Sequence, residues 1–253
     1  MLINLFYFLV RAFCKIVGLS FSFSNDGEDF ALMKYLAKIK NGIYIDIGSH
    51  RPVKISNTFL FYLLGWKGVC VDPLPSLKNK YRFIRRRDKF INAAVFGSKS
   101  KSQEDFNFYY YKNHTDNSTF DPARVKELST NFGREPSSVI PVPKITVAEM
   151  LSSSEEFFGK SKEIQLLNLD IEGFEIDILQ DLFSLNVYPW VICVEELGQT
   201  AETLQNGEIY KLMKNNGYIL GSRTFLSSIY VLKNQLSHLP SPYIKELESI
   251  KEL

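Results

Sequence analysis

Acidic side chains follow four apolar segments that have the pattern of buried strands. The first segment ends at Asp46, the second at Asp72, a later one at Asp170 and the next at Glu195. In an open parallel sheet, ligands bind where the strands end at their carboxyl termini. Carboxylates gathered there can accept hydrogen bonds from hydroxyl groups, balance a cation or remove a proton. The sequence therefore predicts one ligand site at this rim of a sheet.

The first two acids predict a nucleoside ligand. Gly48 allows a ligand close to the backbone, and Asp72 ends the next strand, where an acid can accept both hydroxyls of a ribose. A dinucleotide fits less well, because the turn has one glycine in place of G-x-G-x-x-G and carries Arg51 and Pro52. S-adenosylmethionine is a nucleoside without phosphates, and its sulfonium cation accounts for the carboxylates.

A repeated order of strand, loop and amphipathic helix must position these acids. Strands are predicted at residues 42–47, 67–72, 89–95, 163–170, 190–196, 217–222 and 227–233, the last two as an antiparallel pair at an edge. Helices are predicted at residues 27–40, 55–65, 76–87, 174–184 and 206–215. This order is typical of an α/β fold with a mostly parallel sheet and helices on both faces. An excursion at about 97–145 has the length of a lid or a binding loop.

Composition excludes some classes of function. The 253 residues carry 30 Lys and Arg against 28 Asp and Glu, so the net charge of +2 lacks the strong positive field of a general nucleic-acid binder. The three cysteines are far apart in the sequence, which predicts a reducing compartment, the cytoplasm, and no cysteine metal cluster. The basic run at 78–89 is typical of a solvated helix face, and an anionic partner such as a lipid headgroup is the alternative.

The ends of the chain are predicted to lie outside the main domain. Residues 1–20 form an apolar and amphipathic helix, with too few apolar residues before Arg11 for the roughly 20 that a spanning helix needs. The pattern fits a helix lying at the inner face of the membrane and equally a helix packed on protein. The main domain is predicted at 21–233, and residues 234–253 form an exposed tail.

Several segments resemble FkbM-type S-adenosylmethionine-dependent methyltransferases. They are SFSNDGEDFAL (21–31), IDIGSHRPVKISNTFLFYLLGWKGVCVDPLP (45–75), VPKITVAEML (142–151), LLNLDIEGFEIDIL (166–179), VICVEE (191–196) and LSSIYVLK (226–233). The resemblance covers residues 21–233, and its most specific parts are the SNT-to-GW-to-VDP run and LDIEGFE. It implies the class I methyltransferase fold, a Rossmann-like sheet of seven strands with the last antiparallel. It also implies an O-methyltransferase that acts on a hydroxyl of a surface-glycan sugar or a related metabolite.

Site roles follow from the same resemblance. Asp46 and Gly48 are expected at the methionine end of the cofactor, Asp72 at the ribose, and Asn92 and Ala93 at the adenine. Ser49 and Pro73, each next to one of these residues, complete the expected cofactor site.

The acceptor hydroxyl needs a base or a metal to lower its pKa. The available groups are Asp170, Glu172, Glu195 and His50, and the three acids could instead hold Mg²⁺ or another divalent cation. The acceptor is expected to be a small molecule or a glycan and not a nucleic acid. The oligomeric state is left open. A nucleotide-sugar or NAD-dependent oxidoreductase and a non-catalytic scaffold at the membrane remain as alternatives.

Overall fold

The computed structural model describes residues 21–98, 107–158, 163–171, 173–200 and 202–238. The predicted helix at 1–20, the tail from 239, Cys14 and Glu172 therefore lie outside the described residues. None of the helices in the described part of the chain combines the length and the apolar character that crossing a bilayer requires.

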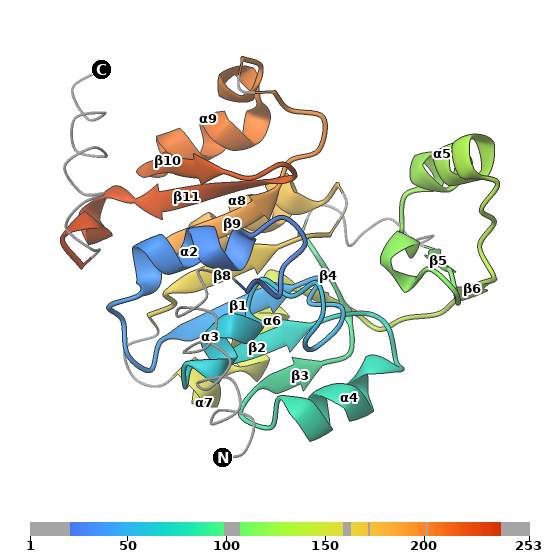
Figure 1. The fold of residues 1–253 in the computed structure, drawn as a ribbon, viewed down its shortest axis with the longest axis horizontal. Helices are drawn as coiled ribbons and strands as arrows, with labels where there is room; N and C mark the ends of the chain where they lie inside the picture. Colours follow the sequence, from blue (N-terminus) through green and yellow to red (C-terminus); the bar gives the residue numbers. More distant parts are fainter. Residues whose placement is uncertain (1–20, 99–106, 159–162, 172, 201, 239–253) are drawn as a thin grey trace.

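A seven-stranded sheet forms the centre of the protein, in the order β10-β11-β9-β8-β1-β2-β3 (Figure 1). Its strands are β1 (Ile43–Ile47), β2 (Lys67–Val71), β3 (Lys89–Ile91), β8 (Leu166–Leu169), β9 (Val191–Glu195), β10 (Tyr218–Arg223) and β11 (Ser227–Leu232). Strand β1 pairs in parallel with β2 and β8, and β11 is antiparallel to both β9 and β10. The predicted Rossmann-like α/β sheet with its last strand antiparallel is confirmed.

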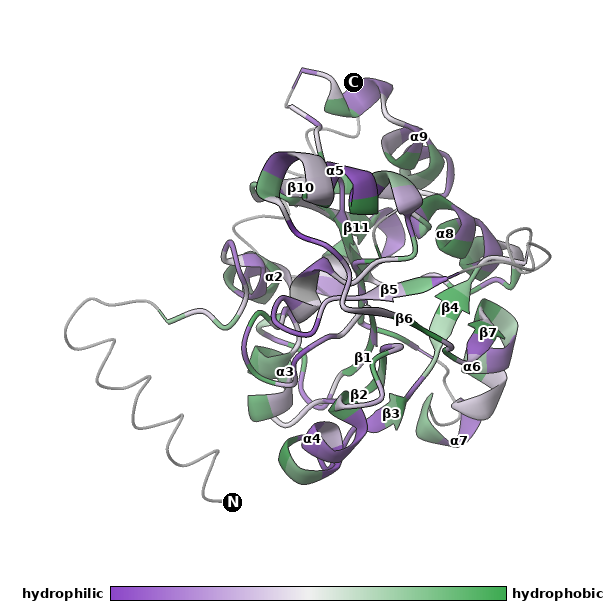
Figure 2. Cartoon of the chain, turned by 90° about the vertical axis from the view of Figure 1, so that its right-hand side faces the viewer, coloured by the Kyte–Doolittle hydropathy of each residue, from purple (hydrophilic) through white to green (hydrophobic). Residues whose placement is uncertain are grey.

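Helices cover both faces of this sheet (Figure 2). One face carries α2 (Glu28–Leu36), α3 (Phe59–Leu63) and α4 (Leu77–Ile84), and the other carries α6 (Val147–Ser153), α7 (Glu155–Phe158), α8 (Glu175–Ser184) and α9 (Glu208–Asn215). The strands alternate between the two cores, because Tyr44 packs with the first group while Ile45 and Ile47 pack with the second. Asp46 therefore faces the side of α2 and α3.

The predicted extent of the third strand is wrong. Instead of one strand at 89–95, the chain forms β3 and then β4 (Ala94–Phe96), which leaves the main sheet and pairs in parallel with β7 (Lys144–Thr146). The break falls at Asn92, whose side-chain amide donates to the backbone carbonyl of Asp72 over 2.9 Å. An apolar run alone does not reveal such a change of partner strand.

The long excursion contains its own small elements. Strands β5 (Phe108–Tyr110) and β6 (Ser138–Ile140) pair antiparallel, and the 3₁₀ helix η1 (Thr115–Asn117) and α5 (Pro122–Phe132) lie between them in sequence. Figure 1 shows this group beside the sheet, not over one of its faces. The short helices η2 (Leu204–Asn206) and η3 (Lys233–His238) complete the described chain. Residues 234–238, predicted to begin an exposed tail, lie in η3 instead, and Leu236 is buried in the core.

A buried ion pair lies beneath α4. Arg85 is fully buried, and its Nε donates to Asp88 Oδ2 over 2.6 Å. Asp88 also accepts hydrogen bonds from the Tyr44 hydroxyl and from the backbone N–H of Gly68. A side chain at Gly68 would overlap the Tyr44 ring, because an added Cβ would lie 1.8 Å from it. The pair thus links β1, β2 and the turn after α4.

We expect Asp88→Ala to lower the free energy of unfolding by about 3–5 kcal/mol, because it leaves the buried Arg85 charge without its carboxylate. Urea unfolding measures the loss. The matched control is Glu127→Ala, which removes the partner of Arg124 in an ion pair whose side chains are 32% and 47% exposed. That change should cost at most about 1 kcal/mol. Equal losses in both variants would contradict the role given to the buried pair.

Candidate functional site

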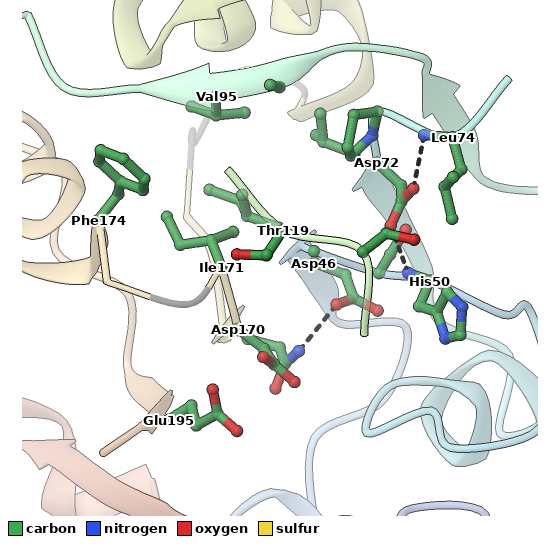
Figure 3. Close-up of a pocket in the computed structure, with 18 of the residues that line it drawn as sticks. Asp46, His50, Asp72, Leu74, Val95, Thr119, Asp170, Ile171, Phe174 and Glu195 are labelled. Carbon is green, nitrogen blue, oxygen red and sulfur yellow. Dashed lines mark hydrogen bonds between the residues drawn. The ribbon is translucent and has the colours of Figure 1, made fainter. Parts of the chain in front are cut away.

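A pocket lies where the parallel strands end, with acids from four of them in its wall. Asp46 of β1, Asp72 after β2, Asp170 after β8 and Glu195 of β9 all line it. In Figure 3, Asp170 and Glu195 occupy one end of the pocket and Asp72 the other, with Asp46 between them. Four of the acids predicted for the site thus surround one space. Glu172 lies outside the described residues.

Asp46 is buried and held by two neighbours. The Thr58 hydroxyl donates to one carboxylate oxygen, and Asn168 Nδ2 donates to the other over 2.9 Å. Burial raises the pKa of Asp46, while the positive charge of Arg85 and these two hydrogen bonds oppose the rise. Arg85 also donates to the Thr58 hydroxyl over 3.0 Å, so the buried ion pair is connected to this acid.

Asp72 accepts one backbone hydrogen bond at each carboxylate oxygen. The N–H of His50 donates over 2.9 Å and that of Leu74 over 2.8 Å. Burial nevertheless dominates and raises the pKa of Asp72 to about 7. Each oxygen keeps a further lone pair, so this carboxylate can still accept from two hydroxyl groups.

Gly48 is required where the ends of β1 and β8 meet. Its φ of +78° favours glycine, and an added Cβ would lie 1.7 Å from the carbonyl oxygen of Asp170. The next residue, Ser49, is 4% exposed and lines the pocket. Its hydroxyl has no hydrogen-bond partner among the described residues. A buried polar group in this state points to a partner supplied by a ligand.

His50 connects the pocket to the excursion. Its ring Nε2 lies 2.9 Å from the Thr115 hydroxyl of η1, while its backbone orients Asp72. In Figure 3 it lies at the Asp72 end, away from Asp170 and Glu195. His50 thus links the pocket wall to η1 and orients Asp72, and its expected role toward the acceptor stays a prediction.

Aromatic and hydroxyl side chains complete the wall. Phe96 packs edge-to-face against Phe120 and Phe174, with ring centroids 5.3 and 5.4 Å apart. All three rings line the pocket, as do the hydroxyl residues Thr115, Ser118 and Thr119 of the excursion.

Two of the remaining predicted cofactor residues, Pro73 and Ala93, also line the pocket. Asn92 is not among the described lining residues, and its amide supports the backbone of Asp72 instead.

The sequence analysis missed Asn168. It pairs directly with Asp46 across β8 and β1, and it accepts a hydrogen bond from Asn57 over 2.9 Å. The available signal was a polar residue inside the apolar run LLNLD, where burial requires a partner.

The described residues contain no group of three His, Cys, Asp or Glu side chains arranged to hold a metal ion. The set considered for a divalent cation, Asp170, Glu172 and Glu195, includes one acid, Glu172, that lies outside the described residues.

Comparison with known families adds one finding. The family model described as Methyltransferase FkbM domain matches residues 46–220, which is more than half of the chain. Neither a search of curated proteins nor a search of solved structures found a match.

Asp72 makes stability depend on pH. Its pKa is about 7 in the folded protein, against about 3.9 for an aspartate in an unfolded chain. Between these values the folded state keeps a proton that the unfolded state has released. The stability contributed by Asp72 is therefore present below about pH 4 and is lost as the pH rises to about 7.

We expect Asp72→Asn to gain stability relative to the unchanged protein across this pH window, as measured by urea unfolding at several pH values without ligand. Glu127→Gln, on the exposed side of α5, should leave the slope unchanged. A stability difference between Asp72→Asn and the unchanged protein that stays constant with pH would contradict the raised pKa.

Proposed function

The chain belongs to the FkbM methyltransferase family, and from this premise we propose that it transfers a methyl group from S-adenosylmethionine to a hydroxyl of a sugar or a related metabolite. The observation that carries the proposal is the pocket itself. Two buried and oriented carboxylates, Asp46 and Asp72, share it with two more accessible ones, Asp170 and Glu195.

The residues present fit this cofactor. Asp72 offers two carboxylate oxygens to the ribose hydroxyls, and the Ser49 hydroxyl is free to donate to a carboxylate or accept from an amine. Asp46 lies near the middle of the pocket and accepts a hydrogen bond at each carboxylate oxygen, and a carboxylate there would favour a cation. Ala93, Val95 and other apolar lining residues give the purine a dry surface.

The chemistry needs few protein groups. The cofactor supplies an electrophilic methyl carried on a positively charged sulfur. Asp170, with Glu195 as the alternative, would accept the proton of the acceptor hydroxyl during methyl transfer. Thr115, Ser118 and Thr119 can orient further sugar hydroxyls, and the rings of Phe120 and Phe174 can cover a sugar face. His50 keeps Asp72 in position.

The oxidoreductase alternative is disfavoured by two observations. The turn at Gly48 lacks the glycine pattern of a dinucleotide site, and the family match is to a methyltransferase domain. Calorimetry separates the alternatives: S-adenosylhomocysteine should bind and NAD should not. Binding of NAD alone would support the oxidoreductase, and binding of neither would support the scaffold.

The direct test is transfer of a tritiated methyl group to cell-envelope glycan fractions and to small polyol metabolites. We expect the tritium label to stay on the acceptor after treatment with mild base. A methyl ether survives this treatment and a methyl ester does not. The same assay with a chelator tests whether methyl transfer requires a divalent cation, a question that the sequence leaves open. Absence of labelled product with all acceptors, despite cofactor binding, would count against hydroxyl methylation.

Two variants test the division between binding and chemistry. Asp72→Ala should weaken S-adenosylhomocysteine binding by at least about tenfold, because two hydrogen bonds to ribose are lost. Asp170→Asn should keep affinity within about threefold and lower turnover by about a hundredfold or more. Calorimetry and the methyl-transfer assay measure the two effects.

The matched control is Glu127→Gln, which should change neither quantity. Equal loss of cofactor affinity in both aspartate variants would contradict the assigned roles.

A further inference from the structure

Helix α4 exposes a dense row of positive charge. The exposed basic side chains of the helix and of the turn that follows it are Lys78, Lys80, Arg82, Arg86 and Arg87. No acidic residue occurs from Pro73 to Arg87. Because the whole chain has a net charge of only +2, this helix is a local concentration of positive charge.

An aromatic ring lies within this charged surface. Phe83 is 76% exposed, and the Arg86 guanidinium lies 5.5 Å from the centre of its ring. The opposite face of the helix carries Leu77 and Tyr81, which are buried in the core. Phe83 is therefore not needed to attach α4 to the protein, and a large apolar ring remains available to a partner.

We propose that this basic face, consisting of Lys78, Lys80, Arg82, Phe83, Arg86 and Arg87, binds an anionic lipid surface. The cationic side chains pair with negatively charged headgroups, and the Phe83 ring enters the boundary between headgroups and acyl chains. This inference goes beyond methyl transfer and does not depend on residues 1–20.

The geometry favours a lipid surface over a nucleic acid. The helix lies at the outer rim of the molecule, next to the edge strand β3 (Figure 1). It presents one exposed ring, whereas single-stranded nucleic acids are bound by several aromatic rings on which successive bases stack. A basic surface attracts anionic headgroups, and an exposed aromatic ring beside it can enter the interface.

The surface also lies close to the pocket. The helix begins at Leu77, three residues after Leu74, whose N–H orients Asp72. If the proposed methyltransferase activity holds, binding through α4 brings the Asp72 end of the pocket near the lipid surface, where an acceptor attached to a lipid would be found.

Vesicle sedimentation with the full chain tests the proposal. Vesicles of phosphatidylcholine with phosphatidylserine should bind at least about tenfold more protein than phosphatidylcholine alone at about 0.1 M salt. The difference should largely disappear at about 1 M salt. Equal binding to both kinds of vesicle, or binding to neither, would overturn the proposal.

Variants assign the effect to this face. Arg82→Glu combined with Arg86→Glu should reduce binding to the anionic vesicles by at least about tenfold. The matched control is Lys211→Glu with Lys214→Glu on the exposed face of α9, which should bind within about twofold of the unchanged protein. Unaltered binding by the α4 variant would overturn the proposal. Far-ultraviolet circular dichroism and thermal unfolding establish that each variant is folded.

A second variant reports insertion directly. Phe83→Trp should show a blue shift of fluorescence on addition of anionic vesicles, because the two native tryptophans, Trp66 and Trp190, lie in or against the core. An unshifted spectrum in the presence of bound vesicles would contradict insertion at this position. A single-stranded oligonucleotide, added at equal charge, serves as a competitor. If it removes the protein from the vesicles completely, the basic face binds nucleic acid instead.

Discussion

The buried charge of Arg85 constrains both the fold and the pocket. A guanidinium removed from water needs acceptors, and it finds them in Asp88, the Tyr44 hydroxyl and the Thr58 hydroxyl. Thr58 uses its own proton to donate to Asp46. One network thus extends from the turn after α4, beneath the sheet, to an acid in the pocket wall. The orientation of Asp46 is therefore a consequence of a contact that also holds β1, β2 and α4 together.

The four acids at the strand ends that line the pocket have two different environments. Asp46 and Asp72 are buried and have each oxygen engaged by a hydrogen-bond donor, which fixes them as acceptors in one geometry. Asp170 is exposed and Glu195 is partly exposed, so both can exchange protons with water and admit a second molecule. Fixed carboxylates suit recognition of a ligand that must be held in one pose. Accessible carboxylates suit proton transfer, because the proton must later leave the site.

The sequence predicts the sheet and the pocket better than it predicts the supporting contacts. Apolar runs ending in Asp46, Asp72, Asp170 and Glu195 are enough to place four acids at one rim, because parallel strands share a direction. The split of residues 89–95 into β3 and β4 depends on a partner strand, β7, about fifty residues away. The role of Asn168 can likewise be recognised only from its pairing with Asp46 on the neighbouring strand. Local patterns do not identify such partners, although a polar residue inside the apolar run LLNLD indicates that Asn168 needs one.

The excursion between β4 and β7 is the part of the pocket best placed to decide which acceptor binds. The part of the wall formed by the sheet has a fixed geometry. Backbone contacts and the buried network hold Gly48, Asp46 and Asp72 in place. The excursion adds hydroxyl and aromatic side chains to the wall, among them Thr119 and Phe120, and it is attached to the core through Phe108 and Phe120. The contact between the Thr115 hydroxyl and the His50 ring joins the excursion to the residue whose backbone orients Asp72. Under the proposed function, changes in the excursion would alter the side of the pocket assigned to the acceptor more than the side assigned to the cofactor, and Thr115 contacts both through His50.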